Sequence, residues 1–336
     1  NHAQGMAYAC HKMKVKGTVF MPTTTPNQKI KSVKMFGREH IDIQLVGDTY
    51  DDASNAAKIY CEQQNATYVH PFDDMDVIAG QGTVGLEIFK DADVKIDYIL
   101  LAIGGGGVAA GTSTVFKQLS PHTKIIGIEP QGAPSMKASI NAGHVVELET
   151  IDKFVDGAAV KRVGDKTFEI CKQTLDDIIV VPEGKVCTTI LELYNESAIV
   201  AEPAGALTIA ALDFLQEEIK GKNVVCLVSG GNNDITRTEE IKERSLLYEG
   251  LKHYFIIRFP QRAGALKNFL NNVLGENDDI THFEYQKKTN RESGPVLLGI
   301  ELKYKEDFEP LLIRMEENKI QYQLLNEKPD LFTFLI

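Results

Sequence analysis

Hydrophobic residues in the first 250 positions fall into two kinds of run that alternate along the chain. Short runs that are apolar throughout and rich in β-branched residues predict strands buried on both faces. Longer amphipathic runs between them predict helices. Strands that alternate with helices imply a parallel sheet covered by helices. The predicted strands are 17–21, 41–46, 98–103, 124–128, 178–181 and 224–228, and the predicted helices are 51–64, 82–90, 110–119, 165–175, 185–194 and 205–219.

The pattern changes near residue 247, after a charged helical segment at 239–244. A strand, a helix, two strands, a helix and a last strand follow in this order, which is the ferredoxin-like βαββαβ unit. Their ranges are 253–259, 263–274, 280–287, 296–302, 308–318 and 321–325. We therefore predict an α/β domain over residues 1–248 and a second domain over residues 249–336.

Composition narrows the class of protein. The chain of 336 residues is 43% hydrophobic and 25% charged, which is typical of a globular protein with room for two domains. Its net charge of −11 disfavours nucleic acid as a partner. The most apolar stretch, 197–215, carries Glu202 and Pro203, so it is not predicted to cross a membrane.

The five cysteines are scattered, odd in number and without a CxxC pair. This usage predicts free thiols in a reducing compartment, and hence a cytoplasmic protein. It offers no zinc-ligand spacing, and no metal site is expected.

Four consecutive glycines, Gly104, Gly105, Gly106 and Gly107, follow a predicted strand, and Val108 lies between them and the next predicted helix. Glycines let the backbone approach a ligand and turn its N–H groups inward, and a helix N-terminus adds partial positive charge. The stretch therefore favours a phosphate site over a simple tight turn. It has neither the spacing of a dinucleotide fingerprint nor the Lys-Ser/Thr of a Walker loop, which points to a small phosphorylated cofactor.

A second polar turn, Ser229-Gly230-Gly231-Asn232, follows another predicted strand. Ligands of open α/β sheets bind at the carboxyl ends of strands, so Ser229 could offer a hydroxyl there, or it could cap the next helix. Glu202, in an apolar setting before a helix, is either a site acid or a helix-start carboxylate. The adjacent acids Asp73 and Asp74 are interpreted as turn or capping residues.

Together these motifs resemble the fold-type-II pyridoxal-phosphate enzymes, and within them the biosynthetic threonine dehydratase family. The resemblance covers essentially the whole chain. It rests on Asn1-His2-Ala3-Gln4-Gly5, the four glycines, Ser229–Asn232, and the segments Ala79–Thr83 and Glu202–Ala206. The second domain resembles the ACT-like regulatory domain of that family, with 259–266 as its ligand turn, in the short form that has a single such domain.

The resemblance implies the cofactor pyridoxal 5'-phosphate, with its phosphate on Gly104–Val108, Asn1 on the ring hydroxyl oxygen and Ser229 facing the pyridine nitrogen. A serine hydroxyl would leave the ring a weaker electron sink, which suits elimination better than transamination. The family's Schiff-base lysine lies in a Ser-Phe-Lys-Leu-Arg-Gly-Ala motif that is absent here. We therefore expect that lysine upstream of Asn1, an N-terminally incomplete chain with no catalytic residue of its own, and doubtful activity of the chain alone.

The implied reaction converts L-threonine to 2-oxobutanoate and ammonia in isoleucine biosynthesis, and L-serine to pyruvate. The resemblance implies isoleucine as the regulator, with valine as an opposing effector. Members of the family typically form homotetramers, so a homotetramer is expected. Three alternatives stay open: a catabolic threonine or serine dehydratase, a serine racemase, and a non-catalytic amino-acid-binding regulatory subunit. The 259–266 turn favours the biosynthetic enzyme among them.

Overall fold

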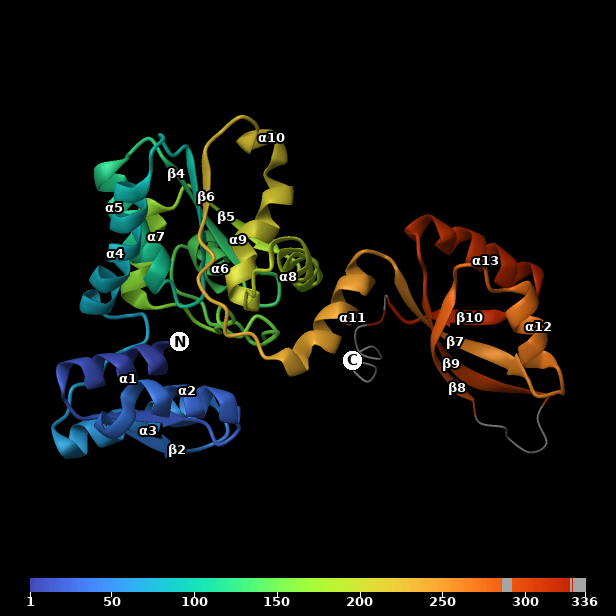
Figure 1. The fold of residues 1–336 in the computed structure, drawn as a ribbon, viewed down its shortest axis with the longest axis horizontal. Helices are drawn as coiled ribbons and strands as arrows, with labels where there is room; N and C mark the ends of the chain where they lie inside the picture. The colour runs from blue at the N-terminus through green and yellow to red at the C-terminus, as the bar shows by residue number, and fades with distance from the viewer. Residues whose placement is uncertain (286–291, 327, 329–336) are drawn as a thin grey trace.

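A computed structural model describes residues 1–285, 292–326 and 328, and its chain is arranged in three parts (Figure 1). The N-terminal part holds a two-stranded parallel sheet, β1-β2, packed against helices. Its small core is formed by Ala7, Val19, Met21 and Val33. In chain order its elements are α1 (His2–Met13), β1 (Gly17–Met21), α2 (Asn27–Gly37), the 3₁₀ helix η1 (Arg38–His40), β2 (Ile41–Leu45) and α3 (Tyr50–Gln64).

The middle part is built on a four-stranded parallel sheet with strand order β5-β4-β3-β6. Its strands are β3 (Tyr98–Ala102), β4 (Lys124–Pro130), β5 (Asp177–Val181) and β6 (Val224–Cys226). Its helices are α4 (Met75–Asp91), α5 (Gly107–Leu119), α6 (Ser135–Ala142), α7 (Asp165–Thr174), α8 (Glu183–Ser197), α9 (Pro203–Ala210), η2 (Ala211–Phe214) and α10 (Gln216–Ile219).

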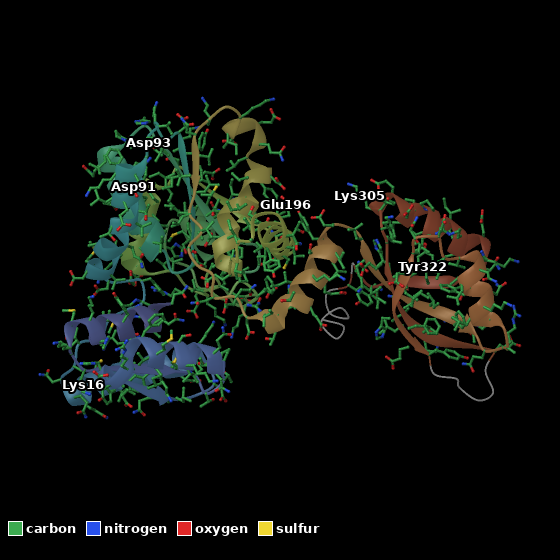
Figure 2. The ribbon with its side chains drawn as sticks, in the orientation of Figure 1. Lys16, Asp91, Asp93, Glu196, Lys305 and Tyr322 are labelled. Atoms are coloured by element: carbon green, nitrogen blue, oxygen red, sulfur yellow. The ribbon has the colours of Figure 1, made fainter. Side chains whose placement is uncertain are left out.

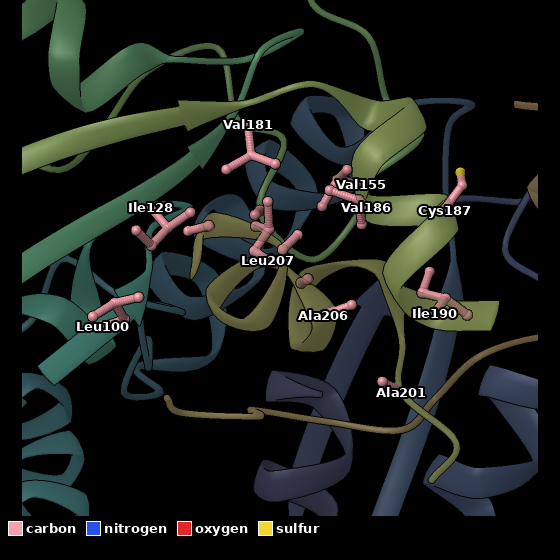
Figure 3. Close-up of a cluster of buried hydrophobic side chains, with 14 of the residues drawn as sticks. Leu100, Ile128, Val155, Val181, Val186, Cys187, Ile190, Ala201, Ala206 and Leu207 are labelled. Carbon is pink, nitrogen blue, oxygen red and sulfur yellow. The ribbon is translucent and has the colours of Figure 1, made fainter. Parts of the chain in front are cut away.

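Each face of this sheet contributes to a separate hydrophobic core. Leu100 and Ile128 face one core with α8 and α9, and Figure 3 shows them beside Leu207 and Val186. Ile99, one position before Leu100, and Ile125, three positions before Ile128, face the other core with α5 and α7. Because side chains alternate along a strand, both faces are buried, which confirms the predicted parallel sheet covered by helices.

The C-terminal domain is a four-stranded antiparallel sheet with order β10-β7-β9-β8. After η3 (Ile235–Arg237), α11 (Thr238–Tyr248) leads into it (Figure 1). Its two helices share one core with the sheet, so the predicted ferredoxin-like order is confirmed. The elements are β7 (Lys252–Pro260), α12 (Ala265–Asn272), β8 (Asp279–Tyr285), β9 (Ser293–Glu301), η4 (Lys305–Asp307), α13 (Phe308–Glu317) and β10 (Gln321–Leu324). The predicted 280–287 strand extends over residues 286 and 287, which lie outside the described residues.

Several predicted boundaries were wrong. The predicted 82–90 helix begins at Met75, because Asp74 accepts hydrogen bonds from the N–H groups of Asp76 and Val77 and caps it. The predicted 205–219 helix is divided into α9, η2 and α10. The predicted 224–228 strand ends at Cys226, and α1, α2 and α6 were not predicted as helices.

All five cysteines are free thiols, as the sequence predicts. Charged side chains such as Asp91, Asp93 and Glu196 lie on the outside of the middle part (Figure 2). Among the described residues, no helix has both the length and the apolar character needed to cross a membrane.

Candidate functional site

The glycine loop lies between the end of β3 and the start of α5. Gly106 has φ +95°, a left-handed conformation that favours glycine, and it precedes the first turn of α5. In the described part of the chain, the backbone N–H groups from Gly104 to Ala109 donate no hydrogen bond. A row of free amides at a helix N-terminus is the arrangement that binds a phosphate.

Two neighbouring segments enclose this loop. A Cβ on Gly104 would lie 3.1 Å from Ala158 Cα, and a Cβ on Gly105 would lie 2.3 Å from the Phe72 ring. The loop therefore has backbone on one side and an aromatic ring on another, with no room for side chains at these positions. The four glycines are explained by this packing as well as by the free amides.

Helix α7 supports the loop through a hydrogen bond, and no local sequence pattern indicated this role. The buried Thr167 hydroxyl donates a 2.7 Å hydrogen bond to the carbonyl oxygen of Gly105. The Asp73 carboxylate accepts hydrogen bonds from the N–H groups of Asp165, Lys166 and Thr167, and so caps α7. The interpretation of Asp73 and Asp74 as capping residues is confirmed, but the sequence could not show that Asp73 caps a helix 92 residues away.

The segment before α4 is ordered by a histidine. His70 Nδ1 accepts hydrogen bonds from the N–H groups of Phe72, at 3.3 Å, and Asp73, at 2.8 Å. Burial lowers the pKa of His70, which keeps that nitrogen free to accept. The turn positions both the ring that covers Gly105 and the carboxylate that caps α7.

Glu202 forms hydrogen bonds with two of the other predicted motifs, the one that begins at Asn1 and the Ser229–Asn232 turn. This side chain is 7% exposed at the start of α9. Its Oε1 accepts a 3.0 Å hydrogen bond from Asn1 Nδ2, and its Oε2 accepts a 3.2 Å bond from the N–H of Asn232. Asn232 Nδ2 also donates to Asn1 Oδ1. Three segments up to 231 residues apart in sequence therefore meet here, and Glu202 contacts both Asn1 and the Ser229–Asn232 turn.

Ser229 follows β6 by three residues and is exposed, with no hydrogen-bond partner among the described residues. Its hydroxyl is available to a ligand. Asn233 Oδ1, four residues further on, is buried without a partner in the described chain. Such an unpaired buried acceptor is costly unless a ligand or water completes it.

Asn1 also lines a cavity of about 770 Å³ that opens between α1, β1 and α3. The glycine loop and Ser229 do not line it. Across the junction, Lys29 of α2 pairs with Asp156 at 2.7 Å, which links the N-terminal and middle parts. The site therefore lies where the two parts meet, and the N-terminus lies at this junction in Figure 1.

The residues present fit pyridoxal phosphate. The free amides and helix N-terminus suit its phosphate, Asn1 is held in place by Glu202, and Ser229 presents an unpaired hydroxyl. In the described residues these groups lie on strand ends and helix starts, where backbone positions are fixed by the sheet.

Two family models match the chain. Residues 1–230 match the model described as pyridoxal-phosphate dependent enzyme. Residues 243–335 match the model described as the C-terminal regulatory domain of threonine dehydratase.

Individual relatives agree with these matches. The L-threonine dehydratase biosynthetic IlvA of Halalkalibacterium halodurans is 60% identical over 336 residues, which are 100% of this chain and 81% of that protein. The structure of the processed form of threonine deaminase isoform 2 from Solanum lycopersicum has a TM-score of 0.69 and 39% identity, and the match covers 73% of this chain and 71% of that one. The serine racemase of Dictyostelium discoideum has a TM-score of 0.62 and 30% identity, with 70% of this chain and 74% of that one covered.

Proposed function

Since this chain belongs to the biosynthetic threonine dehydratases within the pyridoxal-phosphate-dependent enzymes, we propose that it serves the conversion of L-threonine to 2-oxobutanoate and ammonia. The observation that carries the proposal is the row of unpaired amides from Gly104 to Ala109 together with the Asn1–Glu202–Asn232 cluster. Gly157 lies against both, since a Cβ on Gly104 would be 3.2 Å from the Gly157 carbonyl oxygen and a Cβ on Gly157 would be 3.6 Å from Glu202 Oε1. L-Serine is the second substrate of the proposal. The regulatory-domain match over 243–335 and the 60% identity to a biosynthetic dehydratase favour this reading over serine racemase.

In this proposal the amides of Gly104, Gly105, Gly106, Gly107 and Val108 bind the cofactor phosphate. Asn1, fixed by Glu202, donates toward the ring hydroxyl oxygen. Ser229 faces the pyridine nitrogen with a neutral hydroxyl, which does not hold a proton there as a carboxylate would. When bound, pyridoxal phosphate withdraws electrons from the substrate α-carbon, and the weaker withdrawal set by Ser229 favours loss of the β-hydroxyl over transamination.

Binding of two probes, pyridoxal phosphate and pyridoxal, by the 336-residue chain tests the cofactor site. Because the amide row would contact only the phosphate, we expect pyridoxal phosphate to bind at least about tenfold more tightly, which is the worth of one charge-assisted hydrogen bond. Absorbance titration measures both affinities. Production of 2-oxobutanoate from L-threonine, compared with pyruvate from L-serine, then tests the substrate.

Matched glycine variants make the test specific. Gly106→Ala places a methyl group at φ +95°, 2.9 Å from Thr167 Cβ, whereas Gly143→Ala is strained at φ +79° with nothing within 4 Å. Only Gly106→Ala should lose preference for the phosphate. Equal binding of the two probes by the unchanged chain, or equal effects of the two variants, would contradict the assignment.

The effector site of the proposal is a cavity of about 360 Å³ in the C-terminal domain. The predicted 259–266 turn lines it, together with Lys267, Phe283 and Tyr285. Aromatic rings suit an aliphatic side chain, and Arg262 and Lys267 suit a carboxylate. We therefore assign isoleucine to this cavity, with valine as a second ligand.

Thermal denaturation with added isoleucine tests this assignment. Isoleucine should raise the Tm of the chain, and Arg262→Gln should reduce the rise, whereas Arg258→Gln, on the preceding strand β7 and outside the cavity, should not. An unchanged Tm and unchanged activity with isoleucine would refute it.

Four further points remain predictions. They are the position of the Schiff-base lysine upstream of Asn1 with inactivity of the chain alone, the homotetramer, the cytoplasmic location, and the domain boundary between residues 248 and 249.

A further inference from the structure

Three potential metal ligands converge away from the cofactor site, in the N-terminal part. His11 lies in the last turn of α1, and Glu39 and His40 lie in η1. One ligand atom from each of the three lies within 4.8 Å of the other two. Cysteine spacing gives no sign of this cluster, and its two histidines are 29 positions apart in the sequence.

Two of the three distances between these atoms match the edges of a metal coordination tetrahedron. His11 Nδ1 lies 3.4 Å from His40 Nδ1, and His40 Nδ1 lies 3.3 Å from Glu39 Oε1. Two ligands bound at about 2.0–2.1 Å to a tetrahedral zinc ion are separated by about 3.3–3.4 Å. The ligand atoms of His11 and Glu39 lie within 4.8 Å of each other, and the Glu39 side chain, 70% exposed, has room to rotate to the same spacing.

The surroundings of the cluster suit a bound cation. The side chain of His40 is 16% exposed, so this metal ligand is packed against the protein. The side chain of Glu39 is 70% exposed, so an ion can reach the site from solvent. Lys16 donates to the main-chain oxygen of Glu39, not to its carboxylate, and Arg38 is a further positive charge close to Glu39. Lys16 lies at the outer edge of the N-terminal part (Figure 2).

From this geometry we infer a binding site for a divalent transition-metal ion, of the zinc, cobalt or nickel class, held by His11 Nδ1, His40 Nδ1 and the Glu39 carboxylate. Two imidazoles and one carboxylate select these ions over magnesium and calcium, which prefer oxygen ligands. The fourth position is taken by water, since the protein supplies three ligands. The bound ion joins the end of α1 to η1, and α1 is the helix whose first turn follows Asn1.

Co²⁺ titration of the 336-residue chain, followed by visible absorption, tests this site. The chain should bind one equivalent with a ligand-field band, and Zn²⁺ should displace it. His11→Gln and His40→Gln should each weaken binding by at least about tenfold, the smaller end of the loss seen when even an outer partner of a metal ligand is removed. Zn²⁺ should also raise the Tm of the unchanged chain but not that of His11→Gln.

His144→Gln is the matched control, because His144 is exposed and lies outside the cluster. It should bind Co²⁺ as the unchanged chain does. No ligand-field band in the unchanged chain, or equal affinity in His11→Gln, would overturn the site and leave a pair of imidazoles that share one proton. A thiolate charge-transfer band that alkylation removes would also overturn it, since the ion would then sit on cysteine.

Discussion

At the scale of single residues, two buried carboxylates each accept two hydrogen bonds. Glu202 accepts from Asn1 Nδ2 and from the N–H of Asn232. Glu129, fully buried at the end of β4, accepts from the N–H groups of Met136 and Lys137 at the start of α6. Burial raises the pKa of Glu129 to about 7, in spite of these two hydrogen bonds.

Glu129 should make stability fall as pH rises. Its carboxyl has a pKa near 4.5 when unfolded and about 7 when folded, so the folded state holds the proton more tightly. The stabilisation is therefore present below about pH 4.5 and is lost as pH rises toward 7, by up to about 1.4 kcal/mol per pH unit. Urea denaturation of the unchanged chain and Glu129→Gln between about pH 5 and pH 7.5 measures the slope, which the variant should lack.

Glu196→Gln, at the exposed end of α8, is the control and should keep the slope of the unchanged chain. Parallel profiles for the unchanged chain and Glu129→Gln would show that Glu129 titrates normally.

At the scale of elements, the glycine loop depends on α7, which supports it from the side of its carbonyl groups. Asp73 caps α7, and Thr167 of α7 donates to the carbonyl oxygen of Gly105. The loop conformation, with Gly106 at φ +95°, is thus fixed through hydrogen bonds to its carbonyl groups, which leaves its N–H groups free.

Thr167→Val should weaken pyridoxal phosphate binding, because it keeps the side-chain shape and removes the hydroxyl that holds Gly105. We expect a loss of about 1 kcal/mol, or roughly fivefold in Kd, measured by absorbance titration. Thr174→Val, in the same helix with its hydroxyl bonded to Ser113 and Ile170, is the control. If both variants bind the cofactor equally well, α7 does not order the loop.

At the scale of the whole molecule, α11 connects the middle part to the C-terminal domain (Figure 1). Glu243 on α11 accepts a 2.6 Å hydrogen bond from the Tyr254 hydroxyl and forms a 2.9 Å ion pair with Lys252, both on β7. The Lys252 side chain is 8% exposed. This buried pair fixes the helix against the first strand of the C-terminal domain.

Glu243→Gln should lower the free energy of unfolding by about 3 kcal/mol, because it leaves Lys252 charged and buried without its partner. Urea denaturation measures this change, and Glu239→Gln, exposed on the same helix, should be nearly neutral. The double variant Glu243→Gln/Lys252→Met should recover part of the loss. A double variant as unstable as the single one would show that the charge left at Lys252 is not the cause.

The sequence by itself determined the order of strands and helices and the two kinds of sheet. A strand buried on both faces must be apolar throughout, and 98–103 and 125–128 carry that pattern whatever surrounds them. The glycine loop was also visible locally, because four adjacent glycines are needed where backbone must approach backbone and ligand. The acids at 73 and 74 were predicted as capping residues for a similar local reason.

Tertiary structure alone decided which distant residues share a site. Glu202 could be a site acid or a helix-start carboxylate until the fold brought Asn1 and Asn232 to it. Asp73 reaches a helix 92 positions away, and His11 and His40 meet only because α1 packs against η1. The physical reason is that hydropathy and turn chemistry act over a few residues, whereas hydrogen bonds of a buried side chain depend on how whole elements pack.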